Sequence, residues 1–118
     1  MKDNILIFDF LDEDRVCSHV KANFTTGEVS VENFTDIVVM TVFGVNKPTI
    51  DGLLEFFEER VFPETRPDSD VLLRMLGLRE YNPLDICRKT HGKCWEDDMW
   101  IRFDGENLDW NTVKNMLP

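Results

Sequence analysis

The chain has 118 residues, of which 42% are hydrophobic and 11% aromatic, and its formal net charge at pH 7 is −10. This length fits one domain that can bury most of its apolar surface, and the apolar content excludes a disordered tail. The negative charge argues against direct binding to nucleic acid, which depends on a concentrated positive field. No apolar run reaches the ~18 residues of a membrane span and the N-terminus has no signal-like pattern, so we expect no membrane contact and a cytoplasmic location.

The first 47 residues predict an antiparallel sheet. The second strand alternates most clearly, because Val16, Ser18 and Val20 share one face while Cys17 and His19 share the other. A turn with the sequence TTGE follows it. The last expected strand, DIVVMTVF, is rich in β-branched residues. The expected strands cover residues 4–10, 15–24, 29–34 and 36–43.

From residue 48 the apolar residues recur with a helical period. Ile50, Leu53, Leu54 and Phe57 fall at i, i+3, i+4 and i+7 behind Thr49, a suitable N-cap. A second helix is expected within 67–78 with Asp68 or Ser69 as its cap and Gly77 as its end, and a third from Asn82-Pro83 to a stop at Gly92. The remaining expected elements are a strand at 99–103, a turn at 104–107 and a short helix at 109–117.

These elements predict one α+β domain over residues 1–118, mainly β and acidic in 1–47 and mainly α with one strand in 48–118. The expected architecture is an N-terminal antiparallel sheet, a hairpin plus added strands, packed against three short helices. A late strand and a short C-terminal helix complete it. The expected core contains Phe8, Val20, Val31, Val39, Leu54, Phe57, Leu72, Leu76, Ile86, Trp100 and Ile101.

Three side chains in the stretch CRKTHGKC could bind zinc. Cys87, His91 and Cys94 have the spacing C-x3-H-x2-C, and Cys17 or His19 could supply a fourth ligand. Structural zinc sites usually contain two close pairs such as C-x2-C, which this chain lacks. We therefore expect no cofactor and a buried Cys87 at a helix end, with a small zinc-binding interaction domain as an alternative.

No motif combines a nucleophile, a base and an orienting group, so we expect the protein not to be an enzyme. A cysteine and a histidine four residues apart on a helix have poor geometry for a transfer reaction. Four arginines could form a functional positive surface at Arg60, Arg66, Arg74 and Arg79. We expect them instead to pair with acidic neighbours, which are Glu59, Glu64, Asp68, Asp70 and Glu80.

The part of the chain after residue 48 contains several short motifs that match one known pattern. The positions that carry them are Arg60, Pro63, Arg66, Leu76, Gly77, Leu78, Gly92, Asp97, Trp100, Ile101 and Trp110. Together they resemble the N-terminal region of bacterial HipA-like kinases, whereas the first 47 residues match only as a hairpin with a TTGE-like turn. The sequence contains no Gly-rich phosphate loop, H-R-D loop or D-F-G motif. The resemblance therefore implies a freestanding relative of the kinase's leading module, of the kind carried by mobile elements, with a binding role.

The charge is concentrated before residue 60, where 12 acidic and 4 basic side chains give a balance of −8. Such a surface suits a protein partner with a basic groove, through long-range steering, although acidity can also serve solubility alone. The expected function is an anti-CRISPR-like inhibitor of a host nucleic-acid-handling enzyme, such as a CRISPR effector nuclease, by DNA mimicry. The alternative is a regulatory module that docks on a separately encoded HipA-like kinase, as in a toxin–antitoxin pair. The expected partner-binding residues are Asp12, Glu13, Asp14, Glu28, Glu32 and Asp36.

Overall fold

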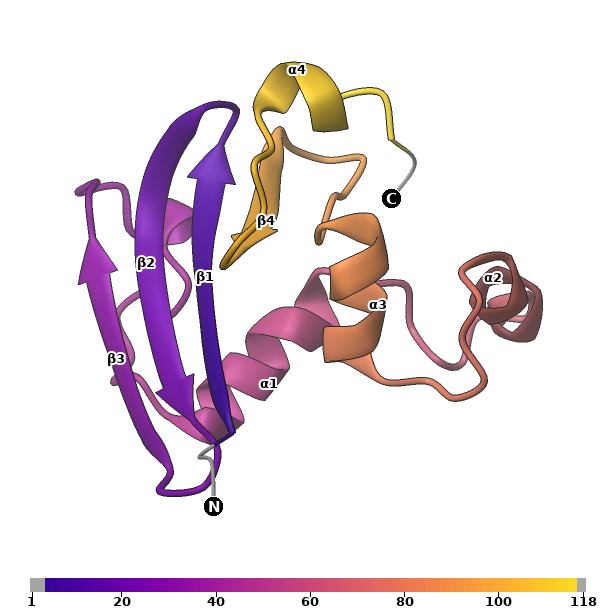
Figure 1. Cartoon of the computed structure of the whole chain (residues 1–118), viewed down its shortest axis with the longest axis horizontal. Coiled ribbons are helices and arrows are strands. Elements are labelled where there is room, and N and C mark those ends of the chain that lie inside the picture. The colour runs from indigo at the N-terminus through magenta and orange to yellow at the C-terminus, as the bar shows by residue number, and fades with distance from the viewer. Residues whose placement is uncertain (1–3, 117–118) are drawn as a thin grey trace.

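The computed structural model describes residues 4–116, and its elements confirm the α+β fold class (Figure 1). None of the helices in this part of the chain is long and apolar enough to cross a bilayer. In chain order the elements are β1 (Ile5–Asp12), β2 (Arg15–Asn23), β3 (Glu28–Asn33), the 3-10 turn η1 (Val38–Met40), α1 (Ile50–Glu59), α2 (Ser69–Met75), α3 (Pro83–Thr90), β4 (Met99–Phe103) and α4 (Trp110–Val113).

The four strands form one antiparallel sheet in the order β3-β2-β1-β4. Phe8 on β1 lies opposite Val20 on β2 and Phe103 on β4, so three apolar side chains meet on one face. Successive strand residues point to opposite faces, which places Leu11 and its partner Trp100 on the other face. There they pack with Val113 of α4, so the sheet is covered on both sides at this end.

The main core lies between the sheet and α1, with α3 beside it (Figure 1). The rings of Phe10 and Phe56 meet edge to face with centroids 4.9 Å apart, and those of Phe8 and Phe57 are 5.4 Å apart. Such aromatic pairs contribute more than their buried area alone. The expected core residues that are buried are Phe8, Val20, Phe57, Ile86, Trp100 and Ile101, and those partly buried are Val31, Leu72 and Leu76.

Two expected core residues are exposed instead. Leu54 is 46% exposed because α1 turns Leu53, Phe56 and Phe57 toward the sheet. The apolar stripe of this helix is wide enough to allow either face, and the larger Phe56 ring fills the space above β1. Val39 is 87% exposed because the strand expected at 36–43 does not form.

The segment 36–43 is a loop with one 3-10 turn. The Thr41 hydroxyl donates to the Val38 carbonyl at 2.7 Å, and Val42 N donates to Ser18 Oγ at 3.3 Å. Val42 and Phe43 are buried in the main core, so the loop crosses the helix-covered side of the sheet on its way to α1. The chain must cross there because α1 begins on that side, and β3 therefore remains the edge strand.

The starts of α1 and α3 follow their expected signals, whereas Asp68 at the start of α2 makes no side-chain cap hydrogen bond. Thr49 accepts a hydrogen bond from Gly52 N, and Asn82 accepts one from Asp85 N, as N-caps do. Helix α3 ends at Thr90, one residue before the expected end, because His91 takes a left-handed φ of +58° and Gly92 follows with +63°. A Cβ on Gly92 would lie 2.7 Å from Ile101 Cδ1, so no larger residue fits this turn without movement.

Candidate functional site

The proposed zinc ligands do not assemble into a site. The Cys87 thiol donates to the Phe57 carbonyl at 3.8 Å, the Cys94 thiol lies 3.8 Å from the Arg60 carbonyl, and His91 Nδ1 lies 3.2 Å from the Ile101 carbonyl. Within residues 4–116, no group of three or more His, Cys, Asp or Glu side chains is arranged to hold a metal. The remaining two candidates also lie elsewhere: Cys17 is buried in β2, and His19 contacts Asp9.

The two cysteines of this stretch are also poor nucleophiles. Burial raises the pKa of the Cys87 thiol to about 12, although the nearby Arg60 charge acts in the opposite direction. Burial likewise raises the pKa of Cys94, again against the effect of Arg60. Because the thiolate is the reactive form, neither environment favours covalent catalysis.

The Arg60 side chain joins the end of α1 to the segment 92–99. Its guanidinium donates to the Gly92 carbonyl at 2.8 Å, to the Met99 carbonyl at 2.9 Å, and to both Asp97 oxygens at 2.8 and 3.0 Å. The expected pairing of Arg60 with Glu59 or Glu64 is therefore wrong. Arg60, Gly92 and Asp97 thus meet in one cluster between the end of α1 and the start of β4.

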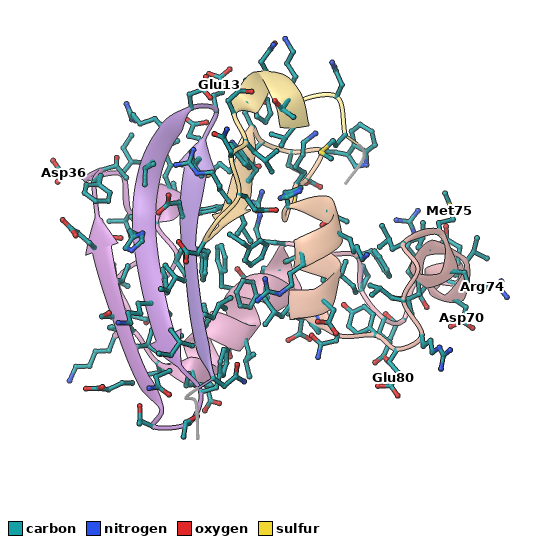
Figure 2. All side chains as sticks on the ribbon, in the orientation of Figure 1. Glu13, Asp36, Asp70, Arg74, Met75 and Glu80 are labelled. Carbon is teal, nitrogen blue, oxygen red and sulfur yellow. The ribbon has the colours of Figure 1, made fainter. Side chains whose placement is uncertain are left out.

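The other arginines divide between paired and unpaired side chains. Arg66 pairs with Asp68 at 2.6 Å, as expected from the sequence. Arg74 and Arg79 form no ion pair with any residue in the described part of the chain. Figure 2 shows Arg74 pointing outward from α2, at the far end of the molecule from β3. Two unpaired arginines do not make an extended positive surface.

Most of the acidic residues expected to bind a partner lie at one end of the sheet. Asp12 ends β1, and Glu13 and Asp14 form the turn to β2, whereas Glu28 begins β3 at the other end. Figure 2 shows Glu13 and Asp36 at the same end, above different strands. Asp14 also has a structural contact, because its carboxylate accepts a hydrogen bond from Trp110 N at 2.8 Å. The remaining member, Glu32, is exposed on β3.

A second acidic group lies on the outward side of α1. Glu55, Glu58, Glu59 and Glu64 line a hollow of about 470 Å³, which we call the glutamate hollow. Its other lining residues are Val61, Pro63, Thr65 and Tyr81. None of these four glutamates forms an ion pair with a described residue.

The sequence contained a signal for this group. Glu55, Glu58 and Glu59 fall at i, i+3 and i+4, on the side of the helix opposite the buried Leu53 and Phe57. The partner-binding residues expected from the sequence all lie before residue 37 and therefore do not include these glutamates.

The negative charge of the glutamate hollow affects the pKa of Tyr81, which lines it. Burial, and then the negative charges of Glu58 and Glu64, raise the pKa of Tyr81. The Tyr81 hydroxyl donates to the Phe62 carbonyl at 2.6 Å, which fixes the ring beside the carboxylates. The hollow is therefore a site of uncompensated negative charge that can attract a cation or a cationic side chain.

A second hollow lies against α1 and shares Glu55 and Glu59 with the first. It measures about 350 Å³, and we call it the valine groove. Val39 and Val45, each 87% exposed, stand at its margin. Its other lining residues are Val38, Thr41, Val42, Phe43, Gly44, Asn46, Gly52 and Phe56.

A third hollow, which we call the Trp95 groove, measures about 400 Å³. It lies between the end of α1, Leu72 of α2, Ile86 of α3 and the segment 93–96. Trp95 is 79% exposed there. Its charged lining residues are of both signs, namely Arg60, Arg66, Lys93, Glu59 and Glu96.

Comparisons with known proteins add no assignment to these surfaces. No protein-family model, curated protein or solved structure matches the chain. The function is therefore argued from the surfaces alone.

Proposed function

We propose that this protein is a non-enzymatic acidic binding protein that occupies a basic surface of another protein. The observation that carries the proposal is the glutamate hollow, in which four carboxylates gather without a basic side chain in the lining. Charge of one sign around a concave surface concentrates the field and speeds association with an oppositely charged partner. Nucleic acid and anionic membranes would be repelled by the same field.

We further propose that the protein inhibits the partner to which it binds. A protein groove that binds nucleic acid is lined with Lys and Arg and is open to a competitor that carries negative charge. The net charge of −10 and the clustered glutamates suit such a competitor. We therefore propose an anti-CRISPR-like inhibitor of a bacterial nucleic-acid-handling enzyme, acting by DNA mimicry.

The test compares two charge variants in affinity capture from nuclease-treated bacterial lysate. One variant neutralises the glutamate hollow through Glu55→Gln, Glu58→Gln, Glu59→Gln and Glu64→Gln. Its control neutralises Glu28 and Glu32 on the edge strand β3, which are exposed but lie outside the hollow.

We expect the native protein and the control to retain the same partner at low salt and to release it at high salt. We expect the fourfold variant to lose it, and the purified partner to lose its nucleic-acid binding when the native protein is added. Retention by the fourfold variant, or a partner that binds nucleic acid equally well with the protein present, would contradict the proposal.

A second candidate function is docking on a HipA-like kinase, and the exposure of Trp95 favours it. A large aromatic side chain at the mouth of a partly apolar groove is a common centre of binding energy in protein interfaces. The Trp95 groove also lies in the part of the chain that resembles the kinase module. If docking is the function, Trp95→Ala will abolish co-purification with a co-expressed kinase of this family. The fourfold Gln variant and high salt will leave it intact.

A further inference from the structure

The segment between β3 and α1 exposes an unusual amount of apolar surface. Val39 and Val45 are each 87% exposed, and Phe34, Ile37 and Val38 are each roughly half exposed. Single exposed apolar residues are common on protein surfaces, but Val38, Val39 and Val45 line one groove, and an apolar group of this kind marks an interaction site. The core does not require these side chains, because Val42 and Phe43 are the residues of this segment that it buries.

Local hydrogen bonds hold the exposed valines in place. Thr41 accepts a hydrogen bond from Gly44 N at 3.1 Å and donates its hydroxyl proton to the Val38 carbonyl. Val42 N is fixed to Ser18 Oγ on β2. A surface that is already ordered loses less conformational entropy when a partner binds.

The charge beside this apolar surface indicates what binds it. Glu55 and Glu59 line both the valine groove and the glutamate hollow, so the two hollows flank the same side of α1. Neither lining contains a Lys or Arg side chain. We infer that together they form one docking surface for a basic amphipathic segment of the partner protein, with aliphatic side chains against the valines and Lys or Arg on the glutamates. This inference rests on the proposed function and names the chemistry of the partner.

Other occupants fit this surface less well. A second copy of the chain would bring two glutamate rows together, and like charges in an interface are strongly unfavourable. Nucleic acid and anionic lipid headgroups would meet the same repulsion. A purely cationic segment would leave the valines exposed, and a purely apolar one would leave the glutamates without partners.

The experiment uses synthetic peptides and the full chain. One peptide, of about 18 residues, carries Leu on one helical face and Lys on the other. A second has the same number of Lys residues but Ser in place of Leu. Binding is followed by fluorescence anisotropy with labelled peptide at low salt.

Two double substitutions of exposed apolar residues form a matched pair. Val39→Ser with Val45→Ser removes the proposed contacts. Val71→Ser with Met75→Ser removes apolar surface from α2, where Figure 2 shows Met75 at the far end of the molecule from Asp36. All four positions are exposed, so neither double variant should disturb folding.

We expect the native protein to bind the Leu/Lys peptide at least about tenfold more tightly than the Ser/Lys peptide. The Val39/Val45 variant should lose about that factor for the Leu/Lys peptide and nothing for the Ser/Lys peptide. The Val71/Met75 variant should behave like the native protein. Glu55→Gln with Glu59→Gln should weaken the binding of both peptides.

Different results would overturn different claims. Equal binding of the Leu/Lys peptide by the Val39/Val45 variant and the native protein would overturn this inference, and so would an equal loss in the Val71/Met75 variant. If the glutamate substitutions still weakened both peptides, the proposed function would stand without it. If they weakened neither, the proposed function would fail together with the inference.

Discussion

Replacing Arg60 with methionine tests the cluster that joins α1 to the last strand. The Arg60 side chain is only 11% exposed and donates to Asp97 and to the carbonyl groups of Gly92 and Met99. Methionine is unbranched and fills part of the same space, but it lacks the guanidinium, whose carbon lies 5.3 Å from the centre of the Phe10 ring. The substitution therefore removes the charge and the hydrogen bonds while it preserves part of the volume.

The expected loss of stability depends on the groups that lose Arg60 as their partner, above all the Asp97 carboxylate. Breaking a buried ion pair by removing one partner costs about 3–5 kcal/mol, because the other charge stays without compensation. Asp97 is 36% exposed and keeps its hydrogen bond from Met99 N, so solvent offsets part of that cost. We expect the free energy of unfolding to fall by about 2–4 kcal/mol. For a domain of this size the melting temperature should fall by roughly 8–16 °C.

Urea unfolding followed by tryptophan fluorescence measures this loss, with a thermal melt as a second measurement. Arg66→Met is the control, because the Arg66–Asp68 pair is about half exposed and should be worth less than about 1 kcal/mol. Arg60→Met combined with Asp97→Asn should show a coupling of about 1–3 kcal/mol. Equal losses for Arg60→Met and Arg66→Met, or strictly additive effects at Arg60 and Asp97, would refute the reasoning.

Three further predictions concern the same region. Gly92→Ala should lower the free energy of unfolding by about 2–4 kcal/mol through backbone strain and overpacking. Gly105→Ala is the control, because Gly105 also has a positive φ but has open space around it, and it should cost only about 1–2 kcal/mol. Equal losses of stability in urea unfolding would contradict this prediction. Burial alone would raise the pKa of Asp97, but hydrogen bonds from Arg60 and Met99 N and the charge of Arg60 hold it below its usual value. The stability that this depressed pKa contributes is therefore complete above the unfolded value and lost as the pH falls through the folded one. The difference in free energy of unfolding between native and Arg60→Met protein should therefore be full near neutrality and shrink as the pH falls through that range, and a difference that does not change with pH would contradict this. A thiol reagent at pH 8 should modify Cys94, which is half-buried, before the fully buried Cys87, and equal rates in the folded protein would show that α3 opens readily.

The sequence determined most of the local structure. The caps at Thr49 and Asn82 and the stop at Gly92 act within one helical turn, so the residues that cause them are neighbours in the chain. The alternation in β2 is equally local, because each strand residue faces opposite to the next. Neither signal depends on where the rest of the chain lies.

The tertiary structure decided how the elements present their side chains. Helix α1 could bury Leu54 or Phe56, and the rings of β1 selected Phe56. The segment 36–43 has strand composition, but strand pairing needs a free edge in the right place, and this segment must cross the sheet to reach α1. Val39 and Val45 are exposed for that reason, and they lie beside Glu55 and Glu59 of the helix that follows, α1. A binding surface assembled from a loop and a helix is set by how the two pack, which composition along the chain does not encode.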